Sequence, residues 1–530
     1  MERFADLLDR LIYTRSRNDK LALLAAYLRA TPDPDRGWAL AALTGGLDFP
    51  AVKASTIRDV VATRVDPVLY SLSRDFVGDT AETVSLIWPR APTDLPPPTV
   101  AEAVENMAGM SRSTVMAELA RLLDRLEPDG RFALLKMATG ALRIGLSGRL
   151  ARTAFAQAFG LDVEEVEEHW HGVKPPYAAL FAWATSPGGS APVADPFQFK
   201  PFMLAHPLEE EEQLDLADFA VEWKWDGIRI QLIGDGETAR LFSRGGEEIS
   251  GAFPEIAGAY RFRGVMDGEL LVRGDLQGGE EGGAASFNAL QQRLGRKKVT
   301  AAMLDDYPAF ARLYDLLIDG DEDLRPMAWS TRRARLEAVL DRLPPDRFDI
   351  SPLIEAADWS ELVQLRDDAR AQAYEGLMFK RRDSAYAAGR KTGLWYKWKR
   401  QPLTADCVLM YAQRGSGKRS SYYSDFTFGC WTAPAAEGGE LLPVAKAYFG
   451  FTDEELKWLD GFVRRHTTNR FGPVREVEKT LVIEIAFDSI HLSKRHKSGL
   501  AMRFPRIARI RTDKPAEEAN LIADLMAFVS

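Results

Sequence analysis

The chain has 530 residues, of which 46% are hydrophobic and 27% are charged, and its formal net charge is -9 at pH 7. These values are typical of a globular protein with about two to four domains, and they exclude a disordered or fibrous chain. No stretch approaches the roughly 18 consecutive apolar residues of a membrane-spanning helix, and the acidic start MERFADLLDRLIY lacks the pattern of a signal peptide. We therefore expect a soluble, cytoplasmic protein with no membrane partner.

Residues 1 to about 185 carry apolar positions at spacings of three and four, broken by Pro and Gly, which predicts an all-α domain. The stretch ATSPGGSAPVADPFQ, which ends at Gln198, has the composition of a linker and places a domain boundary near residue 190. After about residue 200, short alternating strands such as GIRIQLIG, with a few helices between them, predict a mixed α+β domain. From residue 403 onward, strands around one helix, TDEELKWLDGFVRRH, predict a small β-barrel.

The sequence contains two cysteines, Cys407 and Cys430, and six histidines, without CxxC or HxxxH spacing. This excludes a disulfide framework and argues against a structural zinc site. His169 and His171 could bind a metal ion, but two helical residues that are two positions apart point to different faces. We therefore expect no metal site at this pair.

Two strips of the chain are basic although the whole chain is acidic. The first, from Leu377 to Gln401, contains Lys380, Arg381, Arg382, Arg390, Lys391, Lys397, Lys399 and Arg400 against the single acid Asp383. The second, from Ser493 to Lys514, contains Lys494, Arg495, Lys497, Arg503, Arg506, Arg509, Arg511 and Lys514 against Asp513. A solvated charged face is the ordinary explanation of such a run. Basic strips with aromatic residues between them also suit the binding of phosphate groups.

The segment VEWKWDGIRI, residues 221–230, places Lys224 in a predicted β-hairpin. A lysine in a model peptide titrates near pH ~10.4, so a nucleophilic lysine requires burial or neighbouring cations. The pattern K-x-D-G also recurs by chance, and its Asp-Gly pair is a turn signal in which Asp226 has a structural part. Alone, this motif favours a surface lysine over a nucleophile.

Further motifs follow Lys224 in order along the chain. They are FSRGGEE with Arg244, MDGELLV with Asp267 and Glu269, RLYDLLIDG with Tyr314, EGLMFKR with Glu375 and Lys380, and WYKWKR with Lys397 and Lys399. This ordered set resembles the motifs of the covalent nucleotidyltransferases, which include DNA ligases, RNA ligases and mRNA capping enzymes. The last strip, LAMRFPRIARIRTDKPAEEAN, is similar to the C-terminal motif of ATP-dependent DNA ligases. The resemblance covers essentially the whole chain.

This resemblance implies a role for each residue of the first motifs. Lys224 would attack the α-phosphorus of ATP, expel pyrophosphate and hold AMP as a phosphoramidate. Glu222 would read the adenine amino group from the same strand face. Arg229 and Arg244 would hold ribose and phosphate, and Tyr314 would stack on the adenine ring.

The later motifs would supply the metal site and a cationic clamp. Glu269, which would also contact ATP, and Glu375 are carboxylates suited to Mg²⁺, for which Mn²⁺ could substitute. Lys397 and Lys399 alternate with Trp398, so both amines would face the α-phosphate from one strand face.

Two positions depart from the usual family pattern, and several have simpler explanations. Tyr314 stands where the family usually has Phe, which preserves stacking, while Gly245 stands where Asn is common and removes a side-chain contact. Tyr314 could also be an ordinary core residue, and Glu269 and Glu375 could be surface acids of hairpins.

The helical first part of the chain points to one branch of the family. TGALRIGLSGRLARTAFAQAFG is similar to the final helices of the DNA-binding domain of archaeal and eukaryotic ATP-dependent DNA ligases. The resemblance implies sealing of 3′-OH/5′-phosphate nicks in duplex DNA, through enzyme-lysyl-AMP and DNA-adenylate, in repair, recombination or replication. A GTP-dependent mRNA capping enzyme would leave the helical domain unexplained, and the zinc-finger cysteines of NAD-dependent ligases are absent. An RNA ligase stays open, and the non-enzyme alternative is a catalytically dead DNA-binding scaffold.

The resemblance also implies an architecture of three domains. We expect an all-α DNA-binding domain over residues 1–190, an α+β adenylation domain with antiparallel sheets over 191–402, and an OB-fold β-barrel over 403–530. Arg503 and Lys514 would orient pyrophosphate in the first step, and the barrel would then rotate away to clamp DNA. Such motion predicts a joint at residues 400–404.

The expected partner is nicked double-stranded DNA. A sliding clamp or a repair nuclease is a possible further partner, although no convincing clamp-binding peptide is present. The resemblance implies a monomer associated with the nucleoid, and the excess of Arg over Lys with abundant Ala suggests a bacterium.

Overall fold

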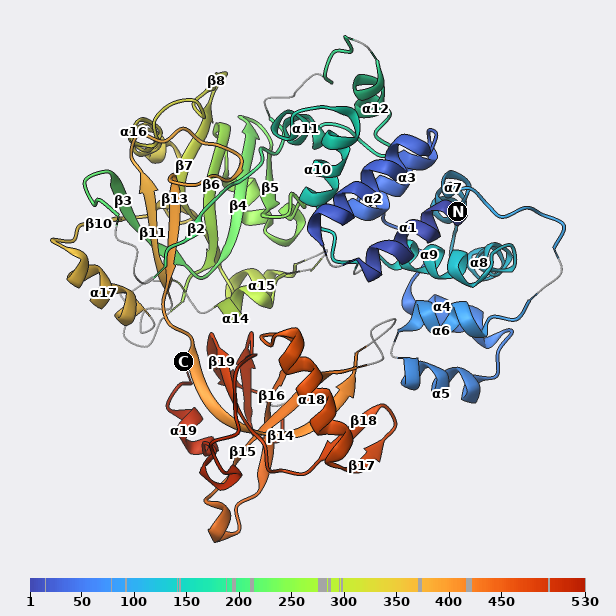
Figure 1. Cartoon of the computed structure of the whole chain (residues 1–530). Coiled ribbons are helices and arrows are strands. Elements are labelled where there is room, and N and C mark those ends of the chain that lie inside the picture. Colours follow the sequence, from blue (N-terminus) through green and yellow to red (C-terminus); the bar gives the residue numbers. More distant parts are fainter. Residues whose placement is uncertain are drawn as a thin grey trace. The chain divides into compact units, whose positions relative to one another are not determined.

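The computed structural model describes the chain apart from residues 15, 78, 91–92, 141, 143, 187, 193–196, 210–213, 275–283, 285–286, 295, 297–298, 370–373, 416–421, 494–495 and 530. Two basic residues of the second strip, Lys494 and Arg495, and part of the expected linker therefore lie outside the described residues. The chain forms two compact units (Figure 1). One contains residues 1–158, 175–178 and 402–530, and the other contains 159–174 and 179–401.

The N-terminal part of the first unit is helical, as predicted. Its helices are α1 (Glu2–Tyr13), α2 (Arg17–Ala30), α3 (Asp35–Thr44), α4 (Ala54–Ala62), α5 (Pro67–Val77), α6 (Thr80–Ile87), α7 (Val100–Gly109), α8 (Val115–Asp124), α9 (Pro128–Thr139) and α10 (Gly148–Phe159). In α1 the buried residues Phe4, Leu7, Leu8 and Leu11 recur at spacings of three and four, which puts them on one face. None of the described helices is long and apolar enough to cross a membrane.

The second unit is built around two sheets. The five-stranded sheet has the order β10 (Leu353–Ile354), β3 (Phe219–Trp225), β11 (Tyr374–Arg381), β13 (Trp395–Lys399) and β2 (His206–Pro207). The other sheet has the order β5 (Ala239–Ser243), β4 (Ile228–Asp235), β6 (Arg263–Val272), β7 (Ala309–Asp319) and β8 (Glu322–Asp323), with β9 (Phe348–Ile350) beside β7. The long neighbouring strands are antiparallel.

Helices and a short strand pair complete this unit. The helices are α11 (Val163–Trp170), α12 (Ala178–Thr185), α13 (Pro254–Ala259), α14 (Phe287–Gln291), α15 (Ala301–Asp306), α16 (Trp329–Val339) and α17 (Trp359–Asp368), and β1 (Met203–Leu204) pairs with β12 (Gly389–Arg390). Helix α16 contacts β7, and the core between them includes Leu316 and Leu336. The mixed, sheet-rich character expected for the middle of the chain is confirmed.

The C-terminal part of the first unit is also rich in sheet. Its elements are β14 (Leu403–Arg414), β15 (Tyr423–Trp431), β16 (Leu441–Ala447), α18 (Asp453–Arg465), β17 (Thr467–Phe471), β18 (Val474–Val477), β19 (Val482–Phe487), β20 (Ser489–Leu492), β21 (Leu500–Arg503), β22 (Arg506–Arg511) and α19 (Ile522–Met526). The main sheet has the order β16-β15-β14-β18-β17, and β19 pairs with β14 and β22. Within the described residues this sheet does not close on itself, so the barrel stays a prediction.

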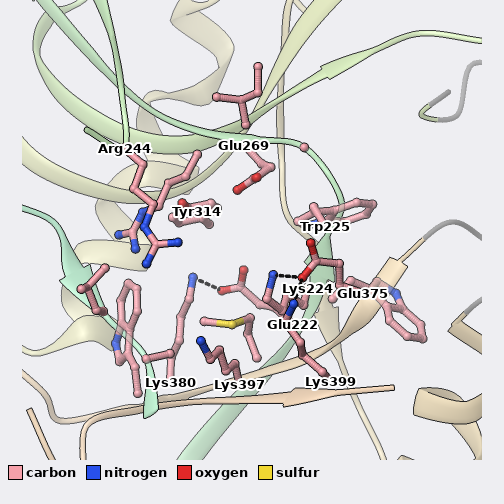
Figure 2. Close-up of a pocket in the computed structure, with 18 residues that line it drawn as sticks. Glu222, Lys224, Trp225, Arg244, Glu269, Tyr314, Glu375, Lys380, Lys397 and Lys399 are labelled. Carbon is pink, nitrogen blue, oxygen red and sulfur yellow. Dashed lines mark hydrogen bonds and ion pairs between the residues drawn. The ribbon is translucent and has the colours of Figure 1, made fainter. Parts of the chain in front are cut away.

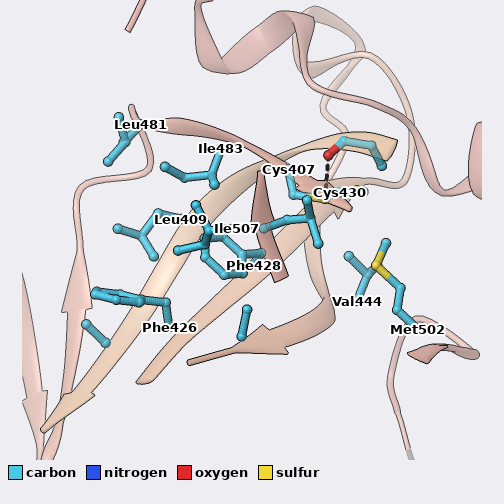
Figure 3. Close-up of a cluster of buried hydrophobic side chains, with 14 of the residues drawn as sticks. Cys407, Leu409, Phe426, Phe428, Cys430, Val444, Leu481, Ile483, Met502 and Ile507 are labelled. Carbon is cyan, nitrogen blue, oxygen red and sulfur yellow. Dashed lines mark hydrogen bonds between the residues drawn. The ribbon is translucent and has the colours of Figure 1, made fainter. Parts of the chain in front are cut away.

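A buried apolar cluster stabilises the C-terminal sheet (Figure 3). Phe426, Phe428 and Ile483 are fully buried in it. Cys407 and Cys430 lie on the neighbouring strands β14 and β15, where they are free thiols with their Sγ atoms 3.4 Å apart. Both cysteines therefore pack as small core residues.

Candidate active site

A cavity of about 400 Å³ lies between the two sheets of the second unit (Figure 2). Most of its lining residues come from β3, β11 and β13 on one side and from β4, β6 and β7 on the other. They are Leu204, Ala205, Glu222, Trp223, Lys224, Trp225, Gly227, Ile228, Arg229, Arg244, Glu269, Tyr314, Glu375, Met378, Lys380, Trp395, Lys397 and Lys399. Every residue that the sequence assigned to the nucleotide or metal site lines this cavity, except Arg503 and Lys514.

Strand alternation explains why the polar residues of one wall converge. Side chains two positions apart on a strand share a face, so Glu222 lies on the same side of β3 as Lys224. Val221 and Trp223, which alternate with these residues along β3, pack against an apolar cluster, and Trp223 also reaches the cavity. β13 repeats the pattern, because Trp398 enters that cluster while its neighbours Lys397 and Lys399 line the cavity. One apolar face therefore orients the charged residues of both strands.

The ammonium groups of Lys224 and Lys399 meet at one carboxylate. Lys224 Nζ donates a hydrogen bond to Oε2 of Glu375, and Lys399 Nζ lies 2.9 Å from the same oxygen. Burial opposes the charged carboxylate, but the two ammonium groups outweigh it and lower the pKa of Glu375 to about 2. The neighbouring Gly376 has φ +138° and lies opposite both lysines in the sheet. A Cβ atom there would lie 2.2 Å from the carbonyl oxygen of Trp398, so only glycine fits.

A second buried ion pair joins Glu222 to Lys380. Lys380 Nζ donates to Oε1 of Glu222 at 2.9 Å, both side chains are 2% exposed, and Arg333 lies 3.9 Å from the same oxygen. Burial lowers the pKa of Lys380, although Glu222 and Asp315 counteract it. These contacts keep Oε1 occupied and leave Oε2 of Glu222 as a hydrogen-bond acceptor at the cavity.

Aromatic and guanidinium groups form the opposite wall. The ring of Tyr314, which is buried, lies 4.3 Å from Lys380 Nζ and 5.9 Å from the guanidinium carbon of Arg229. Arg229 donates to the Met203 carbonyl at 2.6 Å and to Asp267 Oδ2 at 3.1 Å. The buried carboxylate of Asp267 therefore holds Arg229 in place.

The carboxyl group of Glu269 lies in the same cavity and is half-buried. Burial raises the pKa of Glu269 to about 8, and Glu375 and Asp226 add to this effect, although Lys224 and Arg229 oppose it. Among the described residues, no three His, Cys, Asp or Glu side chains gather as a metal-binding group. Two carboxylates still suit Mg²⁺, because this ion usually keeps several waters, and a cation would relieve the cost of ionising Glu269.

Two groups of this site were missed by the sequence analysis. Lys380 was recognised as part of a motif but was given no role, because its partner Glu222 is 158 residues away in the chain. Arg333 gave no signal at all, since it lies on helix α16 among other arginines. Arg244, by contrast, was predicted and lies exposed at the rim, directly after β5.

The remaining predicted residues lie in the C-terminal part of the first unit. Lys514 Nζ pairs with Asp406 Oδ2 at 2.8 Å, and Arg511 pairs with the same oxygen at 3.2 Å. The guanidinium carbon of Arg503 lies 5.0 Å from the ring of Phe504. Arg503 and Lys514 therefore belong to one compact unit and the cavity to the other.

Three family models match the chain in order. They are "DNA ligase N terminus" over residues 1–156, "ATP dependent DNA ligase domain" over 202–399 and "ATP dependent DNA ligase C terminal region" over 419–514. The middle model covers all the strands that line the cavity.

Individual proteins agree with these models. A probable DNA ligase of Koribacter versatilis is 32% identical over 98% of this chain and 95% of its own length. DNA ligase 1 of Korarchaeum cryptofilum is 30% identical over 98% of this chain and 97% of its own length. The solved structure Pmar-Lig_PreS3 shares the fold with a TM-score of 0.56 and 15% identity, over 96% of this chain and 99% of that one.

Proposed function

The chain belongs to the ATP-dependent DNA ligases and is an enzyme that seals nicks in DNA, and on this premise we propose that Lys224 carries the AMP between ATP and the nick. The observation that supports this assignment most strongly is the convergence of Lys224, Lys397 and Lys399 with the three carboxylates Glu222, Glu269 and Glu375 in one cavity. In the first step, the neutral amine of Lys224 forms a bond to the α-phosphorus of ATP. The bond from that phosphorus to the pyrophosphate oxygen breaks, pyrophosphate leaves, and the amine loses one proton.

The same cavity supplies the conditions that this attack requires. Glu375 accepts a hydrogen bond from Lys224 and can fix the direction of the amine. The pKa of Lys397 is lowered by burial and by the nearby cations Arg390, Lys224, Lys399 and Arg244. This wall of the cavity is therefore strongly positive. Preorganised cations of this kind stabilise the charge that develops on the phosphate oxygens in the transition state.

The opposite end of the cavity suits the adenosine. The carboxylate of Glu222, which Lys380 and Arg333 contact, accepts hydrogen bonds and donates none. It can therefore bind the adenine 6-amino group and would repel the 6-oxygen of guanine. The Tyr314 ring is available for stacking on the base. We assign Arg229 and Arg244 to the ribose and the phosphate.

Glu269 and Glu375 would hold Mg²⁺, or Mn²⁺ in its place, together with water molecules. The bound ion would neutralise phosphate charge and would give Glu375 a partner other than Lys224. The second and third steps need no further nucleophile from the chain. The nick 5′-phosphate takes the AMP as the bond to Lys224 breaks, and the 3′-OH then attacks that phosphate and releases AMP.

We further propose the domain limits 1–190, 191–402 and 403–530, with an OB fold in the last part and a joint at residues 400–404. In this scheme Arg503 and Lys514 orient pyrophosphate during the first step, and the C-terminal region grips DNA afterwards. We expect a monomer acting on chromosomal DNA in the cytoplasm, in replication, repair or recombination, where a sliding clamp or repair nuclease could be a partner.

Incubation with ATP labelled at the α-phosphate, followed by nicked duplex DNA, tests the proposal. We expect acid-labile label on the protein in the presence of Mg²⁺, and transfer of that label to the DNA when sealing is blocked by a missing 3′-OH. Preference for GTP would instead indicate a capping enzyme, preference for a nicked RNA strand an RNA ligase, and no label at all a DNA-binding scaffold.

A further inference from the structure

A β-hairpin of the C-terminal region is exposed along one strand. Helix α18 ends in Arg464 and Arg465, and β17 and β18 follow, joined by Gly472 and Pro473 (Figure 1). β17 is an edge strand, because the sheet order ends with β14-β18-β17. Residues 468–471 of this strand are all exposed, and the ring of Phe471 at its end is 57% exposed. Strand β17 therefore contributes little to the core, and its outer edge is available for contacts outside the chain.

The two strands of the hairpin place like charges opposite each other. Arg470 on β17 is the register partner of Arg475 on β18. Like charges that face each other across a strand pair destabilise the sheet unless something neutralises them. Arg475 donates to the carbonyl oxygens of Gly472 and Val474, at 2.7 and 3.1 Å, and within the described residues no carboxylate pairs with Arg470 or Arg475.

Two more arginines lie with Arg475 around the ring of Tyr423. The guanidinium carbons of Arg414, Arg464 and Arg475 lie 5.5, 5.6 and 6.0 Å from the ring of Tyr423. The carboxylate of Asp460 accepts a hydrogen bond from Arg464 Nε at 2.7 Å. The Nε atom of Arg414 is buried and has no hydrogen-bond partner in the part of the chain that the structure describes. Three guanidinium groups thus gather around one aromatic ring.

Three further acids of this region, Glu478, Glu476 and Asp425, also have side-chain partners. His466 pairs with Glu478 at 2.8 Å, Lys479 with Glu476 at 3.6 Å, and Lys446 with Asp425 at 3.4 Å. These acids are therefore engaged away from the arginines. A surface with this concentration of positive charge suits an external polyanion, and the flat fork of a guanidinium group matches the paired oxygens of a phosphate.

We propose that Arg414, Arg464, Arg470 and Arg475, here called the hairpin surface, bind the phosphodiester backbone of the DNA substrate. The inference rests on the proposed function in one respect, namely that the C-terminal region grips DNA, and it does not depend on the role of Lys224. Backbone contacts of this kind are independent of base sequence, as sealing at arbitrary nicks requires. They add to affinity through the release of counter-ions from DNA.

The test compares DNA binding over a series of salt concentrations. The double variant R470Q/R475Q removes two charges from an exposed hairpin, R470K/R475K retains them, and R263Q removes a charge from the exposed Arg263–Asp321 pair of β6. For R470Q/R475Q we expect affinity for nicked duplex to fall roughly ten-fold and the slope of log K against log [salt] to become less negative by about two. R470K/R475K should recover most of the affinity, R263Q should match the wild type, and self-adenylylation with ATP should be unchanged in all of them.

An affinity and a salt slope of R470Q/R475Q equal to those of R263Q would overturn the inference and would direct the search to an acidic protein partner. A parallel loss of self-adenylylation in R470Q/R475Q would also overturn it, because the hairpin would then serve the first step. Absence of AMP from Lys224 in the wild type would contradict the proposed function alone, since the salt slopes report DNA binding independently of that residue.

Discussion

Lys380 Nζ lies 2.9 Å from Oε1 of Glu222, and both side chains are 2% exposed. Removal of one partner from a buried ion pair leaves an uncompensated charge, which typically costs about 3–5 kcal/mol. We therefore expect K380M to lower the free energy of unfolding by roughly this amount, as measured by urea denaturation, and to weaken self-adenylylation. K380R should restore part of both.

The double variant E222Q/K380M is the matched control for this prediction. It removes both charges, so its stability should be closer to the wild type than that of K380M. Equal destabilisation in the single and double variants would mean that packing of the lysine side chain, and not its charge, is what matters.

The proton affinity of Glu269 predicts a specific dependence of stability on pH. Its pKa is raised from 4.5 to about 8 in the folded protein, so the folded state keeps a proton that the unfolded state releases. The free energy of unfolding should therefore fall as the pH rises from about 4.5 to 8, and this component should be absent in E269Q. Thermal unfolding of both proteins without Mg²⁺ at several pH values measures it. E237Q, which changes an exposed acid in the β4–β5 turn, should keep the wild-type profile.

The backbone conformation of Gly376 should be necessary for the geometry of the cavity. Its φ is +138°, and a Cβ atom at this position would lie 2.2 Å from the Trp398 carbonyl oxygen, which leaves no room for alanine. G376A should lower stability by about 1–3 kcal/mol or more and should reduce self-adenylylation by displacing Glu375. G258A is the control, since a Cβ atom at that helical position meets nothing within 4 Å. Equal behaviour of the two variants would contradict a spatial role for Gly376.

Variants of Arg503 and Lys514 should affect the first step of the reaction and not the later steps. If they act on pyrophosphate, R503A and K514A should lower self-adenylylation by roughly 100-fold, while the sealing of a pre-adenylylated nick stays close to normal. K446Q, which changes an exposed lysine paired with Asp425, should affect neither assay. The same loss in both assays would assign these residues to DNA binding or to folding, since Lys514 also pairs with Asp406.

Residue spacing was sufficient to predict which charged side chains share a strand face at the cavity, because this depends on local alternation. Glu222 and Lys224 share a face of β3, and Lys397 and Lys399 share a face of β13. Their spacing of two residues alone therefore predicted that each pair points in one direction. The order of the motifs then predicted that the two pairs serve one site, and in the structure all four side chains line one cavity. The helical first part and the sheet-rich remainder were predictable for the same reason, from their periods.

Contacts between distant segments were not predictable from spacing. The partner of Lys380 lies on another strand, and Arg333 reaches Glu222 from a helix. The packing of α11 also escaped prediction, because Glu168 on that helix pairs with Lys200 and Arg325, which lie far along the chain. Closure of the C-terminal sheet likewise depends on long-range pairing, which residue patterns do not fix.

The location of the AMP on the protein tests the central claim most directly. Wild type, K224A and K399A should each be incubated with ATP and Mg²⁺, digested, and analysed by mass spectrometry for peptides that carry AMP. We predict AMP on Lys224 in the wild type and, at a reduced level, in K399A. K224A should unfold at the same midpoint as the wild type and should yield no peptide that carries AMP. AMP on another lysine of the wild type, or undiminished adenylylation of K224A, would contradict the account.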